Sequence, residues 1–293
     1  MGSALDLTYG AMLIGVLFAT FFQGVLSVQA YIYYESFPDD QRRTKLLVAA
    51  VWLLDVTHLV LICNTLYHYL ITSWGDAAAL LVPTPELELH VIFVGLPSLL
   101  CQAFFVHRIW LFTRGNWVLA SALGAACLAT CTITVLISAR LVGAQTVAAF
   151  SHQTSEVIAM FGLGAAVDVA IALVLVFYLQ QGTTHFDRTS FVVARVVNYT
   201  VATGVATSIL AIACLIAYLL SSHTFVFIAM HFSLGRLYTN ALLATLNSRR
   251  ALRQRLQNQP SFAVVTTRII NSVADGEYPL STVTVHHSIK DTC

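Results

Sequence analysis

Four ionisable residues stand out inside strongly apolar stretches of this sequence, and they are the first candidates for chemistry. Asp55 and His58 are about one helical turn apart, so they share one face of a helix. Asp168 and Arg236 lie near the middle of two other apolar stretches. A charged side chain at the centre of a bilayer costs about 2.5–3.5 kcal/mol on insertion scales, so such groups normally face the protein interior and find partners.

Two interpretations of these residues are open. In the first, they line a ligand pocket or an ion path. The candidates for that role are Asp55, His58, Gln102, Asp168, Arg236 and Asn240. In the second, they are ties between helices, for instance through an ion pair between Asp168 and Arg236. Intramembrane Asp and His can relay protons, whereas two opposite charges at similar depth can simply neutralise each other.

Several kinds of reactive site are absent from the sequence. Lys45 and Lys290 are the only lysines, and neither lies in an apolar stretch, which excludes a retinal Schiff base inside the membrane. The pairs His-x-x-x-His and Cys-x-x-Cys, the motif Gly-x-Ser-x-Gly and phosphate-binding loops do not occur. We therefore predict no catalytic residue, no metal site and no cofactor, and a protein that is not an enzyme.

The composition indicates a membrane protein. Of the 293 residues, 58% are hydrophobic and only 10% are charged, and the mean hydropathy is +0.78. Soluble domains carry about 25% charged residues, so a soluble chain of this composition could not cover its surface with polar groups. The formal net charge of +1 gives no reason to expect nucleic acid as a partner.

Seven apolar stretches are long enough to cross a bilayer as helices, which takes about 20 residues. They cover residues 11–33, 46–71, 89–112, 117–141, 157–179, 196–220 and 225–246. The predicted fold is therefore an all-α bundle of seven transmembrane helices over residues 1–246. The seventh stretch is the weakest, because it carries His231, Arg236 and Asn240.

Lysine and arginine in the short loops predict the orientation, since they mark the cytosolic side. The expected membrane-surface and orientation residues are Arg42, Arg43, Lys45, Arg108, Arg114, Arg188, Arg249, Arg250, Arg253 and Arg255. They lie in or beside the turns after the first, third, fifth and seventh stretches, whereas the loop 72–88 has neither Lys nor Arg. We therefore expect the N-terminus outside and the C-terminus in the cytosol. Arg140 is the one exception, at a helix end from which it can reach the interface.

The segment 247–293 is predicted to be a cytosolic tail. Its first part, 248–257, is basic and has Leu252 and Leu256 one turn apart. This pattern fits a short amphipathic helix on the membrane surface, where anionic lipid attracts Arg, or a solvated extension of the seventh span. From Pro260 onward the chain is polar and aperiodic, so we expect disorder.

Residues 165–250 resemble a known family. The resembling elements are Asp168, Arg188-Thr189, Thr203-Gly204, Thr207-Ser208, the run from Leu237 to Arg249 (LYTNALLATLNSR) and the earlier segment Phe104-Phe105…Arg108-Ile109-Trp110. The family is the domain of unknown function 6534, which occurs in multi-pass membrane proteins of mushroom-forming fungi. The resemblance implies a seven-helix membrane protein of fungal type and assigns no activity or ligand. Arg236 departs from the lysine that many relatives have, although the charge is kept.

Four functional hypotheses follow. The leading one is a receptor-like protein that senses a small molecule from outside and signals to a cytosolic partner, in the plasma membrane or an endomembrane. The second is a transporter or channel that uses intramembrane Asp and His, although no inverted repeat is visible. The third is an intramembrane hydrolase built on Asp55 and His58, and the fourth is a structural or assembly role. The lipid bilayer is the one partner common to all four.

Overall fold

The computed structural model describes residues 5–258 except 77, 143–152, 183–186 and 222–223. Within this part of the chain, the side chains of residues 179–200, 203 and 250–258 are not described. The chain divides into two compact units, Met1–Arg250 and Ala251–Cys293. The first unit contains the helix bundle. The predicted disorder from Pro260 onward lies outside the described residues.

The described residues form an all-α fold, as the sequence predicts. The long helices are α2 (Ala11–Ser36), α3 (Arg42–Tyr67), α4 (Pro85–Phe112), α5 (Trp117–Leu141), α6 (Thr154–Gly182), α7 (Asp187–Leu220) and α8 (Val226–Asn258). The short helices are the π-helices η1 (Asp6–Gly10) and η2 (His68–Thr72) and the 3-10 helix η3 (Ala79–Leu81). Each of the seven predicted stretches corresponds to one long helix.

Most of these helices can cross a bilayer. In the described part of the chain, five helical segments are long and apolar enough to do so, and Gly204–Leu220 of α7 adds a shorter apolar helix. Large apolar side chains such as Phe21 and Leu173 are exposed on the outside of the bundle, where lipid would surround them. The chain is therefore a multi-pass integral membrane protein.

Polar caps and turn residues place the helix ends. Thr84 precedes α4, and its Oγ1 accepts a hydrogen bond from the Leu87 backbone N–H at 3.3 Å. Asn116 caps α5 in the same way, with Oδ1 accepting from Leu119 N at 3.2 Å. Such side chains satisfy backbone donors that a helix start leaves free. Gly115 has φ 86°, so the tight turn between α4 and α5 uses a conformation that glycine adopts easily.

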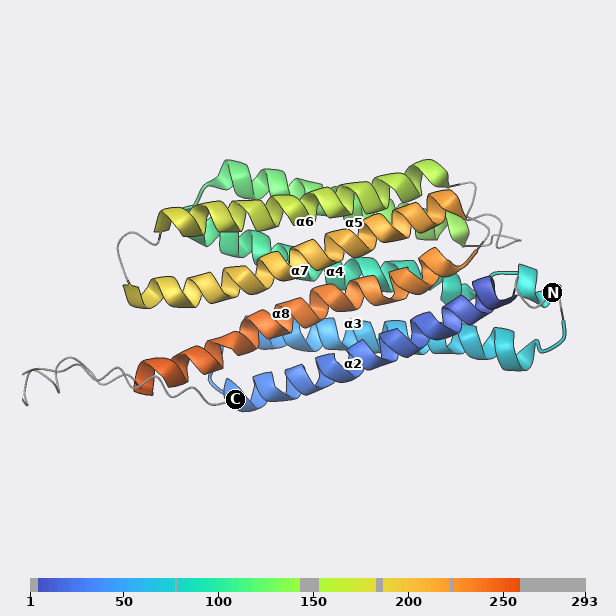
Figure 1. Cartoon of the computed structure of the whole chain (residues 1–293), viewed down its shortest axis with the longest axis horizontal. Helices are drawn as coiled ribbons and strands as arrows, with labels where there is room; N and C mark the ends of the chain where they lie inside the picture. The colour runs from blue at the N-terminus through green and yellow to red at the C-terminus, as the bar shows by residue number, and fades with distance from the viewer. Residues whose placement is uncertain (1–4, 77, 143–152, 183–186, 222–223, 259–293) are drawn as a thin grey trace, which may run out of the picture. The chain divides into compact units, whose positions relative to one another are not determined.

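Helix α8 lies between other helices (Figure 1) and packs closely against them. A Cβ atom on Gly15 of α2 would lie 2.7 Å from the Ala229 Cα of α8, so the two backbones touch. On another side, a Cβ on Gly235 would lie 3.3 Å from Val94 Cγ1 of α4. Small residues allow such close approach between membrane helices. Asn240 of α8 also donates to the Phe22 carbonyl of α2, at 3.2 Å.

Two apolar layers enclose the middle of the bundle along its length. The N-terminal layer lies near the start of α2 and the start of α8, and includes Tyr9, Met12, Ile62, Tyr69, Leu87, Tyr218, Phe225 and Phe227. The C-terminal layer lies near the end of α2 and includes Leu26, Tyr33, Phe37, Val48, Val51, Leu242, Leu243 and Leu246. Along α8, Arg236 and Asn240 fall between the two layers, whereas His231 lies within the N-terminal layer, between Ile228 and Phe232.

Candidate functional site

A buried polar group, the arginine cluster, joins α3 to α8 and consists of Asp55, His58, Arg236 and Thr239. Arg236 Nη1 donates to His58 Nδ1 at 2.7 Å and to the Phe232 carbonyl at 2.8 Å. Its Nη2 donates to the Asp55 carbonyl at 3.4 Å, and Thr239 Oγ1 donates to Asp55 Oδ2 at 2.6 Å. All four side chains are at most 1% exposed, so protein groups supply the partners of Arg236 Nη1 and Nη2, whereas its Nε is buried without a partner.

Two more imidazoles continue from this cluster toward the N-terminal layer. The ring of His58 lies 5.9 Å from that of His90 on α4, and His90 lies 5.6 Å from His231 on α8, between ring centroids. His90 Nδ1 bonds to the Leu87 carbonyl of its own helix. For His58, Nδ1 must be the unprotonated nitrogen, because Arg236 can only donate to it.

A second polar group, the aspartate cluster, surrounds Asp168 of α6. Asp168 Oδ2 accepts from Tyr238 Oη at 2.5 Å and from Thr207 Oγ1 at 2.8 Å. Gln102 Nε2 of α4 donates to Oδ1 at 3.3 Å. Hydrogen bonds to an ionised carboxylate are about twice as strong as neutral ones, so this cluster ties four helices together at one point.

The suggested ion pair between Asp168 and Arg236 is wrong. The two residues belong to different clusters and have other partners. The reason lies in the geometry of α8. Arg236 and Tyr238 are two residues apart, which is about 200° of rotation around an α-helix. Arg236 therefore faces α3, whereas Tyr238 faces α6 and takes the place beside Asp168.

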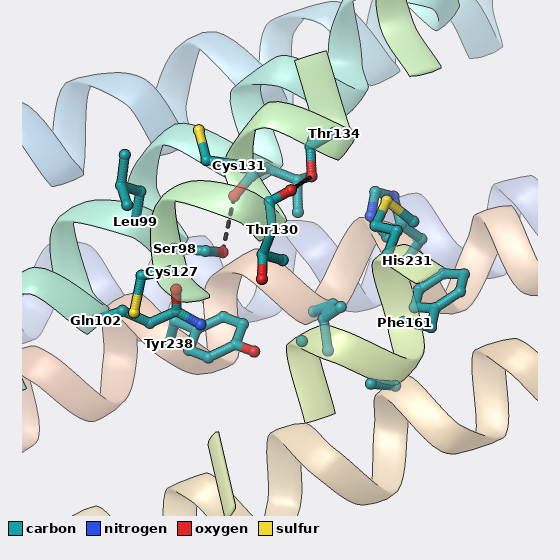
Figure 2. Close-up of a pocket in the computed structure, with 16 residues that line it drawn as sticks. Ser98, Leu99, Gln102, Cys127, Thr130, Cys131, Thr134, Phe161, His231 and Tyr238 are labelled. Carbon is teal, nitrogen blue, oxygen red and sulfur yellow. Dashed lines mark hydrogen bonds between the residues drawn. The ribbon is translucent and has the colours of Figure 1, made fainter. Parts of the chain in front are cut away.

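A cavity of about 50 Å³ lies beside the aspartate cluster (Figure 2), where α4, α5, α6, α7 and α8 meet. Its polar lining comes from Ser98, Gln102, Thr130, Thr134, His231 and Tyr238. Water needs roughly 10–15 Å³ of such volume per molecule and a few polar partners, so this space can hold a few waters or a very small molecule. Gln102 and Tyr238 also line an adjacent cavity of about 20 Å³, together with Asp168.

His231 is the most suggestive side chain of the central cavity. It is 6% exposed and lines the cavity, and its ring centre lies 5.6 Å from that of His90 and 5.7 Å from that of Phe161. Buried polar groups are nearly always hydrogen-bonded, so a polar occupant of the cavity would have this ring as a partner. In Figure 2, His231 and Gln102 lie at opposite ends of the side chains that line the cavity.

The predicted candidates therefore fall into three sets. Gln102 and Asp168 border cavities, whereas Asp55, His58 and Arg236 are enclosed in protein. Asn240 bonds to the Phe22 and Arg236 carbonyls and ties α8 to α2. Sequence reasoning did not select Tyr238, Thr207, Thr239, His90 or His231 as site residues. The spacing of Tyr238 from Arg236 could have indicated a partner for Asp168 on the opposite face of α8.

The predicted membrane-surface residues have varied surroundings. Arg42, Arg43 and Arg114 are exposed. Lys45 Nζ bonds to the Pro38 carbonyl, and the guanidinium of Arg108 lies 5.6 Å from the ring centre of Phe112. The side chains of Arg188, Arg250, Arg253 and Arg255 lie outside the described residues. Residues 248–257 are helical, as a continuous part of α8.

Arg249 forms an anchored ion pair at one end of the bundle. Its Nη2 lies 2.7 Å from Asp40 Oδ2, and its guanidinium lies 4.6 Å from the ring centre of Phe37. Tyr33 Oη donates to the same Asp40 oxygen at 2.8 Å. Partial burial pushes the pKa of the Asp40 carboxyl up, but the hydrogen bonds from Arg249 and Tyr33 outweigh it, so that pKa is lowered overall. This pair holds α8 to the loop between α2 and α3.

Asp40→Asn is expected to lower stability by roughly 1 kcal/mol at neutral pH, as partly exposed ion pairs do. Because folding lowers the pKa of Asp40, its contribution is fully present above the ordinary value of 3.8 and is lost as the pH falls through the folded-state pKa. The difference between wild type and variant should therefore shrink below about pH 4. Thermal unfolding across pH checks this. Asp39→Asn at the exposed neighbouring position is the control, and equal effects of both variants would contradict the assignment.

Comparison with known proteins agrees with the resemblance in the sequence. The chain matches no curated protein and no solved structure. Residues 164–251, from α6 to α8, match the family described as "Family of unknown function (DUF6534)". The matched segment contains Asp168, Thr207, Arg236 and Tyr238, the core of both polar clusters. This helical, multi-pass membrane protein thus carries a region, residues 164–251, that matches the DUF6534 family model.

Proposed function

We propose that this protein is a receptor-like sensor, in which a small molecule inside the bundle changes the position of α8. The proposal rests on Tyr238. This residue lines the central cavity and also donates the 2.5 Å hydrogen bond to Asp168. An occupant that competes for the Tyr238 hydroxyl would therefore act directly on the contact that joins α8 to α6.

Helix α8 is suited to transmit such a change. Arg249 lies eleven residues after Tyr238, or roughly 16 Å further along the helix axis, and forms the ion pair with Asp40. A small rotation or shift of a helix at one point moves its whole length, and packed interfaces respond by switching between discrete arrangements. Movement at Tyr238 would thus be felt at the loop between α2 and α3. That loop is predicted to face the cytosol, where a signalling partner would bind.

The size of the cavity implies two conformations. Pockets for drug-sized ligands are about 300–1,000 Å³, far larger than the roughly 50 Å³ found here. A ligand of ordinary size would need a wider form of the same site, and would favour that form by binding it better. The compact form is held by the aspartate cluster. The aspartate cluster therefore stabilises the compact form against the wider, ligand-bound form.

The other hypotheses receive less support. A transporter or channel needs a polar path to each side, whereas apolar side chains such as Phe232 and Leu242 are buried on either side of Arg236 and Asn240 along α8. A hydrolase built on Asp55 and His58 would need both groups free, but they are bonded to Thr239 and Arg236. In the described part of the chain, no three His, Cys, Asp or Glu side chains gather as metal ligands. The proposal includes no catalytic step.

Hydrogen exchange in the full-length protein tests the coupling. Tyr238→Phe removes the bond to Asp168, and we expect backbone amides of residues 37–44 to exchange about tenfold faster, which corresponds to about 1.4 kcal/mol of local stability. Those amides are protected by bonds such as Asp40 N to the Phe37 carbonyl, at 3.2 Å. Tyr178→Phe on α6 is the matched control, because Tyr178 lies outside both clusters.

Two outcomes would count against the sensor. If exchange over 37–44 is unchanged in Tyr238→Phe, α8 does not transmit from the aspartate cluster to the loop. If hydrogen exchange rises in α5 as much as in residues 37–44, the variant has loosened the whole bundle instead of this loop alone. The selective increase is the result that supports coupling.

A further inference from the structure

An apolar groove of about 530 Å³ runs along the seam between α4 and α5. Leu99, Ala103 and Trp110 line it on α4, and Trp117, Gly124 and Leu128 line it on α5. Both helices are candidate membrane spans, and Trp117 and Leu128 are more than half exposed on the outside of the bundle. The groove therefore opens toward the hydrocarbon of the bilayer, so any occupant comes from the membrane.

The length of the groove matches one leaflet. Its lining residues extend over about 11 positions on each helix, or roughly 17 Å at 1.5 Å per residue. The hydrocarbon core is about 30 Å thick, so the groove reaches from one interface to about the middle of the bilayer. An occupant that fills it is a molecule of one leaflet, about half a bilayer long.

The two ends of the groove differ in polarity. At one end, the ring of His107 stacks on Trp110 at 5.7 Å, and Trp110 lies 5.3 Å from Trp117, between ring centroids. Rings of this kind have a polar edge and an apolar body, and they gather at membrane interfaces. Toward the other end, near Leu99 and Leu128, the wall is apolar. The groove is thus complementary to an amphiphile with one small polar group at the interface and an otherwise apolar body.

The floor of the groove is smooth. It includes Ala103, Ala120 and Gly124, and a Cβ atom on Gly124 would meet nothing within 4 Å. Small residues leave a shallow trough that a flat, rigid molecule can contact closely. A flexible acyl chain would lose conformational freedom in such a site, whereas a fused-ring molecule has little to lose, and rigidity of this kind favours binding.

From these features, we propose that the α4–α5 groove binds a sterol-class lipid, with its hydroxyl at the His107–Trp110–Trp117 end and its rings against Gly124. The proposal goes beyond the sensor function and does not depend on it. The groove has Leu99 and Cys127 in common with the central cavity, so a bound sterol would lie directly beside the cavity wall.

Energy transfer from tryptophan to a fluorescent sterol tests the site. The protein has four tryptophans, and Trp52→Phe with Trp74→Phe leaves only Trp110 and Trp117 as donors. The full-length chain in lipid nanodiscs is titrated with dehydroergosterol, whose conjugated triene accepts energy from tryptophan. We expect transfer that saturates and that is competed by non-fluorescent sterol.

Filling the groove should abolish this binding. Gly124→Leu places a side chain in the open space over the floor, and we expect the apparent affinity to fall at least about tenfold. Gly162→Leu on α6 is the matched control, because a Cβ there also meets nothing within 4 Å and the position is exposed outside the groove. Ala103→Leu fills the groove from α4 and repeats the test if Gly124→Leu does not fold.

Three results would overturn the proposal. Transfer that rises linearly with sterol content and is equal in all variants reports sterol in the bulk bilayer only. Competition by added phospholipid, but not by sterol, would assign the groove to an acyl chain. Undiminished, saturable transfer in both Gly124→Leu and Ala103→Leu would place a sterol elsewhere on the protein.

Discussion

Arg236→Ala should destabilise the folded bundle by about 3 kcal/mol or more, the range expected when one partner of a buried charged group is removed. Arg236 is fully buried and supplies hydrogen bonds to His58, the Phe232 carbonyl and the Asp55 carbonyl. Its removal leaves His58 Nδ1 without a donor. It also leaves Asp55 without the positive charge that interacts with it. Thermal unfolding of the purified protein in detergent measures the loss.

Arg236→Lys is the informative comparison for this prediction. Lysine keeps the charge, but a single ammonium group cannot reproduce the planar fork of donors that reaches three acceptors. We expect it to recover part of the stability lost in Arg236→Ala. If the alanine variant melts at the wild-type temperature, the arginine cluster does not hold α8 to α3. If lysine is as poor as alanine, hydrogen-bond geometry and not charge is the decisive contribution.

Gly15→Leu is expected to have an effect of similar size through packing alone. A Cβ at this position would lie 2.7 Å from Ala229 Cα and 2.8 Å from the Ala229 carbonyl oxygen. These are backbone atoms of α8, so no side chain can rotate away, and the two helices must separate. Overpacking of this kind costs about 1–3 kcal/mol in protein cores and more where the backbone must move. The loss of a monodisperse peak in size-exclusion chromatography, together with a lower melting temperature, reports it.

Gly24→Leu provides a control on the same helix. A Cβ on Gly24 would meet nothing within 4 Å, and the residue is exposed on the outside of the bundle. Leucine there adds an apolar side chain where lipid would surround it and removes a helix-weakening glycine, so stability should be unchanged or slightly higher. Equal losses for Gly15→Leu and Gly24→Leu would mean that the close contact between α2 and α8 does not limit packing.

The fold was predictable because a bilayer leaves few choices. A stretch of about 20 apolar residues in lipid must satisfy its own backbone, and a helix does so within one segment. Helices α4 and α5 therefore end at the predicted residues Phe112 and Leu141. The helix ends that differ most are polar ones, the start of α7 at Asp187 and the end of α8 at Asn258, because polar residues can continue a helix beyond the hydrocarbon. The orientation in the membrane stays a prediction.

For the candidate site, the sequence predicted several of the residues but not which of them contact one another. Apolar surroundings single out Asp55, His58, Asp168 and Arg236, since a charge in lipid is costly. Which of these side chains meet depends on how each helix is rotated about its axis and on the register between neighbouring helices. The sequences of helices that are far apart in the chain specify neither of these. Tyr238 was overlooked for another reason: aromatic residues are common in apolar helices, so its type alone carries little information.

The central place of α8 also bears on how the protein is made. Synthesis runs from the N-terminus, so helices α2 to α7 leave the ribosome before α8. Until α8 is made, Asp55 lacks its contacts with Thr239 and Arg236. A segment with Arg236, Asn240 and His231 partitions poorly into lipid by itself. Its insertion is therefore coupled to docking: the unpaired groups of α2, α3 and α6 form the receiving surface, and α8 completes the interior instead of adding to the outside. Errors in this final step would leave buried charges exposed to lipid, a state that membrane quality control can distinguish from the finished protein.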